Sequence, residues 1–345
     1  MADTTTTRTL AELPAAPPAP RRAVRPAVTA RIVDRVLLIS ALVSLPCLLL
    51  VPLAANGYWY NLLTNLFIFA TLASAWNIIG GYTGYASFGN IAFFGGGAYA
   101  TAVLMTQAKA PFFVAMIAGG ALMALYGAVV GLPILRLKGH YFAIATLGVA
   151  IATREVCNNW ELTGASRPIN LPVTNNPQLF YYTGLGLVVL AVLTAYLIAL
   201  SKLGFGLVAI RENEDAATVM GINATRFKVL AFTINAALCG LAGGLYAFWH
   251  VTIDPPTVFN LDTNVRLIIM AVLGGIGTPL GPVIGAALLT AIQETLWARF
   301  TDLHAILFGA AIIVVVLLMP RGVVYLLRQR VSWKAFVRGL GQYRA

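Results

Sequence analysis

Long apolar segments separated by short polar ones run along most of this chain. Apolar segments close to the bilayer core in length predict membrane-spanning helices. The predicted spans are 36–55, 58–80, 87–106, 112–132, 140–157, 181–201, 226–249, 264–279, 283–298 and 303–319. The pattern therefore predicts an all-α fold, a polytopic membrane helix bundle with about ten transmembrane segments.

The boundary between the predicted spans at 264–279 and 283–298 is rich in residues that interrupt helices. Backbone can leave helical geometry at membrane depth only where protein or a cavity surrounds it. This stretch could therefore form a broken or re-entrant segment. Its glycines and prolines are Gly274, Gly275, Gly277, Pro279, Gly281 and Pro282.

Composition supports lipid as the surroundings of the chain. Of its 345 residues, 59% are hydrophobic and 10% are charged, whereas a soluble domain carries roughly 25% charged residues. So few charges cannot cover a water-facing surface. A cleaved signal peptide is an alternative for the apolar run at 36–55, but that run is about twice the usual length of a signal core. We interpret it as the first spanning helix.

The positive charge of the chain follows its predicted topology. The formal net charge is +11, and the basic residues lie at the ends and in loops between apolar runs, which argues against a nucleic-acid partner. With the N-terminus in the cytoplasm and ten alternating spans, about 18 of the 23 Lys and Arg residues fall inside. We therefore predict a disordered basic cytoplasmic tail at 1–30, a transmembrane domain at 31–325 and a basic cytoplasmic tail at 326–345.

The inner loop at about 202–226 is the most informative segment between two spans. Helix-compatible residues run from Phe205 to Met220, are interrupted by Asn213 and end at Gly221, which predicts a short cytoplasmic helix. Ala216 and Ala217 would form a small face that fits closely into a partner's groove. The charged residues Arg211, Glu212 and Glu214 could pair with charges of that partner. A solvated helical connector is the alternative.

The segment 215–221 of this loop resembles the cytoplasmic EAA-type loop of binding-protein-dependent ABC permeases, with Asp215 where that pattern has Glu. Four further blocks, at 80–104, 137–148, 158–169 and 271–286, resemble the branched-chain amino acid permease family. Sugar permeases belong to the same broad family, but the long outer loop with NNW and TG is more similar to the amino acid and urea branch.

The resemblance implies a permease subunit in a bacterial inner membrane, with both termini in the cytoplasm. Its implied partners are a second permease, two cytoplasmic ATPases and an extracytoplasmic substrate-binding protein. The implied substrates are branched-chain amino acids; urea, short-chain amides and small carboxylates are alternatives. The implied ATPase-coupling loop at about 204–221 contains Gly204, Arg211, Glu212, Glu214, Asp215, Ala216, Ala217 and Gly221.

Polar residues and glycines gather at 77–97, between two spans and into the next. Glycine allows helices to approach closely and backbone to leave helical geometry near a cavity, so this stretch is expected inside the bundle. Asn77, Tyr82, Ser87 and Asn90 could line a pathway, although hydrogen bonding between helices is the alternative.

The sequence contains no motif for catalysis or phosphate binding. It lacks GxxxxGK followed by Ser or Thr, a nucleophile elbow, HExxH and CxxC. We therefore expect no enzyme activity, no metal site and no cofactor on this chain, with ATP and Mg²⁺ on partner subunits. No Asp or Glu lies near a predicted span centre, which argues against an ion-coupled secondary transporter. A channel or transporter working alone remains an alternative.

Overall fold

The computed structural model describes residues 46–53, 57–165, 167–299, 309 and 322–324. The predicted tails at 1–30 and 326–345 lie outside these residues, as do most of the first predicted span at 36–55 and, except for residue 309, the last one at 303–319.

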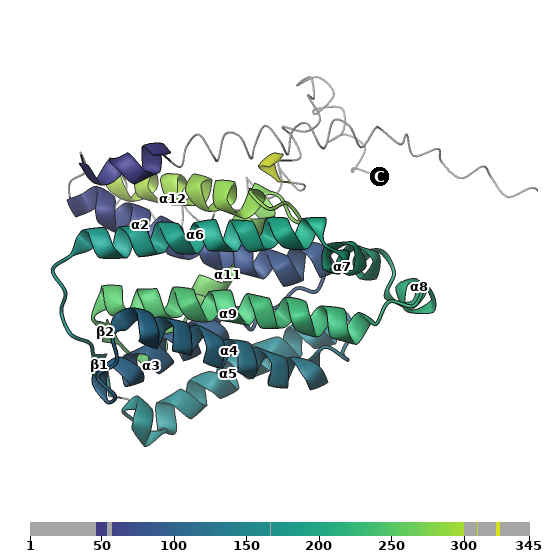
Figure 1. The fold of residues 1–345 in the computed structure, drawn as a ribbon, viewed down its shortest axis with the longest axis horizontal. Coiled ribbons are helices and arrows are strands. Elements are labelled where there is room, and N and C mark those ends of the chain that lie inside the picture. Colours follow the sequence, from purple (N-terminus) through teal and green to yellow (C-terminus); the bar gives the residue numbers. More distant parts are fainter. Residues whose placement is uncertain (1–45, 54–56, 166, 300–308, 310–321, 325–345) are drawn as a thin grey trace, which may run out of the picture.

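The described chain forms a bundle of helices whose longer members run side by side along one axis (Figure 1). A two-stranded antiparallel sheet pairs Ile169 with Ile253 at one end of the bundle. The all-α prediction is confirmed. The elements are η1 (Val51–Leu53), α2 (Gly57–Trp76), η2 (Asn77–Gly81), α3 (Asn90–Thr106), α4 (Phe112–Ile134), α5 (His140–Asn159), η3 (Glu161–Thr163), β1 (Ile169–Asn170), α6 (Pro177–Leu200), α7 (Lys202–Glu212), α8 (Glu214–Val219), α9 (Ala224–His250), β2 (Thr252–Ile253), α10 (Pro255–Val258), α11 (Leu261–Gly274) and α12 (Gly281–Arg299).

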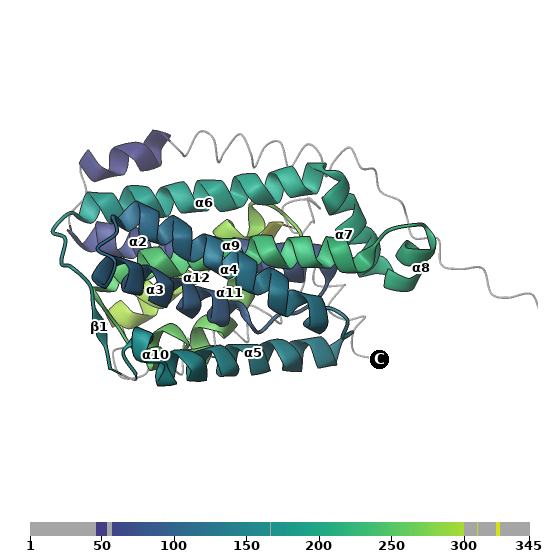
Figure 2. The ribbon, with the colours of Figure 1, turned by 60° about the horizontal axis from the view of Figure 1, so that its bottom comes forward.

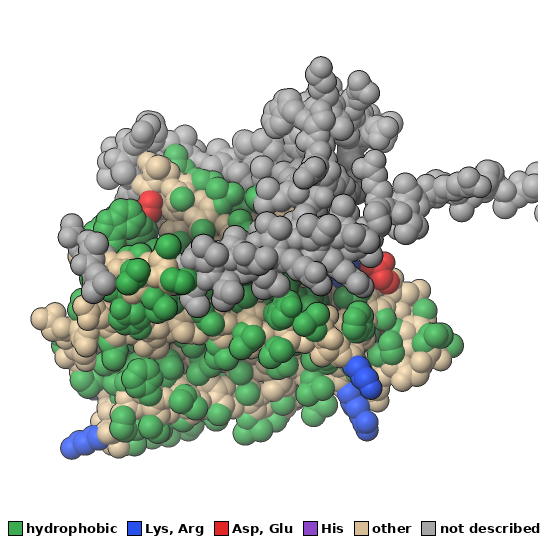
Figure 3. All heavy atoms as spheres, turned by 45° about the horizontal axis from the view of Figure 1, so that its top comes forward, with side chains coloured by type: hydrophobic (Ala, Val, Ile, Leu, Met, Phe, Trp, Pro, Cys, Tyr) green, Lys and Arg blue, Asp and Glu red, His purple; other side chains and the backbone are tan. Residues whose placement is uncertain are grey.

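The surface of the bundle is apolar along its length. Large aliphatic side chains such as Leu125 on α4 and Ile144 on α5 are exposed, and in Figure 3 the charged side chains in view lie toward the two ends. Within the part of the chain that the structure describes, five segments are long and apolar enough to cross a membrane: 57–81, 112–134, 177–200, 224–250 and 255–274. A water-facing surface would not expose so much apolar area. The exact count of ten spans stays a prediction.

The centre of the bundle is formed by α3, α4 and α9, which approach each other closely at glycines. A Cβ atom on Gly97 of α3 would collide with the carbonyl oxygen of Gly240 on α9, and one on Gly243 would collide with that of Phe94. Small residues that let backbones touch are typical of helix contacts in membranes. Leu, Phe and Ala side chains around these contacts form one continuous core.

Two breaks shape the inner part of the bundle. The α2 helix continues into the π-helix η2, and a non-helical segment at 84–89 then leads to α3, which begins at Asn90 rather than at the predicted residue 87. The second break lies at 275–280, where Gly275 and Gly277 have φ angles of +133° and +75°. The predicted interruption is present there, and it separates two helices that pack together, α11 and α12.

Candidate functional site

The predicted coupling loop folds into two short helices that project from one end of the bundle, α7 and α8 (Figures 1 and 2). The side chain of Asn213 accepts a hydrogen bond from the Ala216 amide and so caps α8. Asn is among the residues that favour this position because it satisfies an otherwise unpaired N–H. Gly221 has a φ of +88° just after the helix. The predicted break and the predicted helix end are both confirmed.

The tip of α8 exposes two large apolar side chains. Val219 is 87% exposed and Met220 82% exposed, and the neighbouring Asp215 and Ala216 are also exposed. Ala217 points the other way and is buried against Ile210. The prediction that Ala216 and Ala217 share one docking face is therefore wrong for Ala217, because packing on α7 turns it inward.

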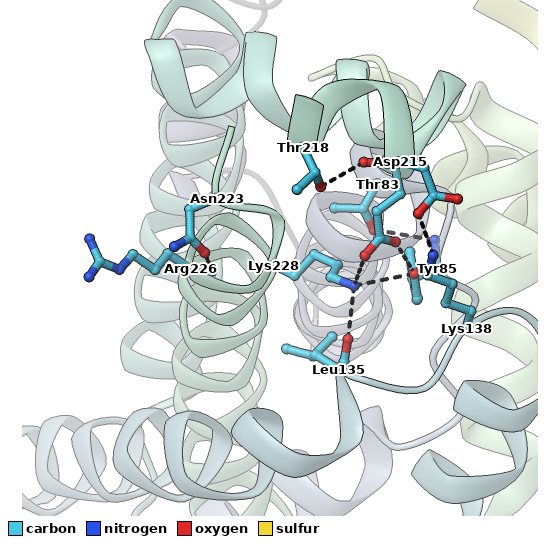
Figure 4. A network of polar contacts seen from close by, with 10 residues as sticks. Thr83, Tyr85, Leu135, Lys138, Asp215, Thr218, Asn223, Arg226 and Lys228 are labelled. Carbon is cyan, nitrogen blue, oxygen red and sulfur yellow. Dashed lines mark hydrogen bonds and ion pairs between the residues drawn. The ribbon is translucent and has the colours of Figure 1, made fainter. Parts of the chain in front are cut away.

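A buried ion pair holds α8 against α9 (Figure 4). The side chain of Lys228 on α9 is 2% exposed, and its Nζ lies 2.8 Å from Glu214 Oε1. The same Nζ donates to the Leu135 carbonyl at 2.8 Å and lies 4.5 Å from the centre of the Tyr85 ring. The Tyr85 hydroxyl donates to the other oxygen of Glu214.

Glu214 is therefore engaged inside the chain, and its pairing with a partner's charge stays a prediction. Burial by itself would raise the pKa of Glu214, but hydrogen bonds from Lys228 and Tyr85 and the charges of Lys228 and Lys138 outweigh burial and lower it. Glu214 is thus held ionised. Its neighbour Asp215 pairs with Lys138 at 2.7 Å on the open surface, and this hydrogen bond raises the pKa of Lys138.

Arg211 and Gly204 hold α7 against neighbouring parts of the bundle. Arg211 Nη1 donates to the Gly81 carbonyl at 3.0 Å, and Nη2 lies 3.4 Å from Glu212 Oε1. Arg211 thereby links α7 to the end of η2, whereas Glu212 stays exposed. Gly204 is buried where α6 turns into α7, and a Cβ atom there would collide with the carbonyl of Ile198.

The four predicted pathway residues are all buried and hydrogen-bonded. Asn77 donates to the Thr278 carbonyl at 2.9 Å and accepts from the Gly277 amide at 2.8 Å, so it fixes the break between α11 and α12. Tyr82 donates to the Ala195 carbonyl, Ser87 accepts from Trp76 and Gly89, and Asn90 donates to Asn235. These contacts are the predicted alternative, hydrogen bonding within the bundle. A role in lining a pathway stays a prediction.

Two features of this region were missed by reasoning from the sequence. The exposure of Val219 and Met220 was not predicted, although two apolar residues directly before a glycine turn in a cytoplasmic loop were a signal for it. The buried Lys228 was counted only as a positive charge on the cytoplasmic side. Its position in the first turns of an apolar helix, after two acidic residues, could have suggested an internal ion pair.

Comparison with known proteins relates this chain to a family of transport proteins. The family described as "Branched-chain amino acid transport system / permease component" matches residues 58–316. The chain is 28% identical to the high-affinity branched-chain amino acid transport system permease protein LivM of Salmonella typhimurium, over 80% of this chain and 72% of LivM.

Two further relatives match a smaller part of this chain. The permease protein LivH of Escherichia coli K12 is 28% identical over 55% of this chain and 66% of LivH. The autoinducer 2 import system permease protein LsrC of Klebsiella pneumoniae is 34% identical over 51% of this chain and 53% of LsrC. No solved structure matches the chain significantly. This multi-pass membrane protein therefore belongs to the family of permease components of branched-chain amino acid transport systems.

Proposed function

We propose that this chain is one of two permease subunits of an ATP-driven importer in a bacterial inner membrane. The second subunit is a similar permease, and two cytoplasmic ATPases hydrolyse ATP with Mg²⁺. An extracytoplasmic binding protein delivers the substrate, a branched-chain amino acid or a related small polar nutrient. LivM and LivH, both relatives of this chain, carry names of branched-chain amino acid permeases, which supports this assembly and this substrate class.

The observation that carries the proposal is the exposed apolar tip of α8. Val219 and Met220 lie at the end of a helix that projects from the bundle, and exposed apolar residues at a projection are typical of a contact with another protein. The buried pair of Glu214 and Lys228 fixes α8 on α9. A docked partner therefore acts on a braced helix and not on a loose loop.

In the proposed mechanism, ATP binding draws the two ATPases together and displaces the docked helices. The permease pair then switches access from the outer to the inner side of the membrane. Such a switch requires that docking bias two packed arrangements of the helices. The orientation follows from the placement of basic residues, with α7, α8 and both termini in the cytoplasm.

The test is co-purification of the ATPases with tagged variants of this chain from membranes of its own host. Burial of a Val or Met side chain contributes about 1.5–3 kcal/mol, and about 1.4 kcal/mol corresponds to tenfold in affinity. We therefore expect Val219→Glu and Met220→Glu each to weaken ATPase association at least tenfold, while the amount of chain in the membrane stays unchanged.

Val173→Glu is the matched control, because Val173 is 81% exposed and lies in the loop between β1 and α6, at the other end of the bundle. It should leave ATPase association unchanged. Normal ATPase recovery with both α8 variants would refute the docking surface. ATP-independent uptake by vesicles that contain only this chain would refute the proposed importer as a whole.

A further inference from the structure

The π-helix η2 and the break between α11 and α12 contact each other through their backbones and one side chain. Asn77, at the start of η2, donates to the Thr278 carbonyl and accepts from the Gly277 amide. A Cβ atom on Gly81, at the end of η2, would lie 2.8 Å from the Gly277 nitrogen. The two backbones therefore touch, and we call this contact between 77–81 and 275–280 the inner junction.

Arg211 of α7 reaches the inner junction with a side chain that is 37% exposed. Its Nη1 donates to the Gly81 carbonyl at 3.0 Å. A Cβ atom on Gly277 would lie 3.3 Å from the same Nη1, and one on Gly84 would lie 2.9 Å from Cγ of Arg211. The guanidinium therefore lies beside both η2 and the break at 275–280, while the aliphatic stem packs against the start of the non-helical segment that leads to α3.

Helix α8 holds the same stretch of chain at Tyr85. The Tyr85 hydroxyl donates to Glu214, and the buried Lys228 binds the second carboxylate oxygen of Glu214. The segment 81–85 is thus bonded to α7 at its first residue and to α8 at its last. Because these two helices carry the proposed ATPase contact, a displacement of them must either break these bonds or move the segment with it.

The backbone around the inner junction contains residues at which its direction can change. Gly84 and Gly277 both have a φ of +75°, a conformation that glycine adopts without steric cost. Hinges in switching proteins are a few loop or element-terminal residues that absorb a change of φ and ψ. The helices on either side can keep their own hydrogen bonds while such residues rotate. The inner junction therefore combines a bond to α7 with positions at which the backbone can turn.

From this arrangement we propose that Arg211 is a positioning residue for transport, which transmits a displacement of α7 and α8 to the inner junction. In the structure, its hydrogen bond to Gly81 holds η2 in place against the break at 275–280. When the ATPases displace α7, Arg211 carries Gly81 with it, and the packing of α11 and α12 on α2 changes. This inference rests on the proposed function, since it names the residue through which the docked ATPases act on the permease.

The experiment measures hydrogen–deuterium exchange of the complete importer in lipid nanodiscs, before and after addition of ATP and vanadate. The peptide that covers 275–280 contains the Gly277 amide, which donates to Asn77, so its exchange reports on the inner junction. Arg211→Met removes every donor of the guanidinium and keeps the apolar stem, whereas Arg211→Lys keeps the charge and a donor group. Lys202→Met is the matched control, because Lys202 is an exposed cation on the same helix.

In the wild type and in Lys202→Met, we expect ATP to change the exchange rate of this peptide about tenfold. In Arg211→Met the change should fall to about twofold or less, since a hydrogen bond from a charged donor shifts an equilibrium about tenfold or more. Peptides of α8 should stay protected by the docked ATPases. In proteoliposomes with leucine-loaded binding protein, Arg211→Met should import about tenfold less leucine per ATP hydrolysed. Arg211→Lys should restore part of both effects.

An ATP response of Arg211→Met equal to that of the wild type would overturn the inference. Loss of ATPase co-purification with Arg211→Met would overturn it as well, because Arg211 would then belong to the docking surface. Faster exchange throughout α4 and α6 of Arg211→Met, already present without ATP, would show a purely structural role and would also overturn it.

A second variant decides if Arg211→Met is not recovered from the membrane. An ATP response of Arg211→Lys that is intermediate then supports the inference, and an unchanged response overturns it. The proposed function is tested separately. Absence of ATP-driven leucine uptake by the wild type would refute the importer for leucine, whereas the exchange comparison requires the docked ATPases but neither leucine nor transport.

Discussion

The two consecutive acidic residues of α8 provide a direct comparison of a buried and an exposed ion pair. Glu214 pairs with Lys228 at 2.8 Å and Asp215 pairs with Lys138 at 2.7 Å. The side chains of the first pair are 2% and 19% exposed, and those of the second are 59% and 85% exposed. Lys228→Met and Lys138→Met therefore remove the same charge at nearly the same distance in two different environments.

The expected effects differ because water can replace only the exposed lysine. Lys228→Met leaves the Glu214 carboxylate and the Leu135 carbonyl without their shared donor. Removing one partner of a buried pair costs about 3–5 kcal/mol. Glu214 keeps some exposure and the hydrogen bond from Tyr85, so we expect about 2–3 kcal/mol for Lys228→Met. Lys138→Met should have no measurable effect on stability, as is common for surface pairs.

Hydrogen–deuterium exchange of the purified chain, resolved by mass spectrometry, measures where this loss occurs. A loss of about 2 kcal/mol increases a local opening equilibrium roughly 30-fold. In Lys228→Met we expect faster exchange in peptides that cover α8 and the first turns of α9. Peptides from the first turns of α4 and from α6 should exchange as in the wild type, and Lys138→Met should match the wild type throughout.

The double variant Lys228→Met/Glu214→Gln separates charge from packing. If the loss comes from an unpaired buried carboxylate, the double variant should be less destabilised than the sum of the single variants, by about 1 kcal/mol or more. Strict additivity would refute the ion-pair argument. Equal effects of Lys138→Met and Lys228→Met would refute the role of burial.

Three further predictions concern pH and packing. The pKa of Glu214 is lowered from 4.5 in the folded chain, so the ionised carboxylate stabilises the fold fully above that pH, and this stabilisation is lost as pH falls through the lowered pKa. The difference in Tm between wild type and Glu214→Gln should therefore be constant from about pH 8 to 5 and shrink below about pH 4. A constant difference down to about pH 3 would contradict this assignment. Gly97→Val should strongly reduce the folded yield in size-exclusion chromatography because its Cβ meets the Gly240 backbone, whereas Gly148→Ala, with nothing within 4 Å, should retain it. Asn77→Ala should lower the free energy of unfolding by about 2–4 kcal/mol in thermal unfolding, since the Thr278 carbonyl and the Gly277 amide lose their partner. Ser87→Ala removes one side-chain hydrogen bond and should lower it by about 1 kcal/mol. Equal losses would contradict the argument that the number of lost hydrogen bonds sets the cost.

Helix positions were predictable where apolar length and local signals agree. The predicted spans at 112–132 and 226–249 lie within α4 and α9 with only small shifts at their ends. The break at Asn213 and the end at Gly221 were predictable because a capping amide and a glycine with positive φ act through their own local backbone. These signals require no knowledge of the rest of the fold.

The direction of the α8 side chains was not predictable in the same way. A six-residue helix has no long apolar stripe, so its inward face depends on contacts from distant segments. Ala217 turns inward onto Ile210, and Glu214 turns toward Lys228 and Tyr85. Tyr85 is 129 residues from Glu214 along the chain. Which charge stays free for a partner is therefore a property of the tertiary structure.

The α9 helix runs from the end of the bundle that carries α8 to the end that carries β2 (Figure 1). It is unbroken over 27 residues, or about 40 Å at 1.5 Å per residue. Its first turns carry Lys228, held by α8, and its middle carries Gly240 and Gly243, which contact α3. Contacts between two sites transmit a signal only if the connecting element has two stable positions. Because α8 is held on Lys228 and the backbones of α9 and α3 meet at Gly240 and Gly97, we expect a displacement of α8 to be carried along α9 to α3.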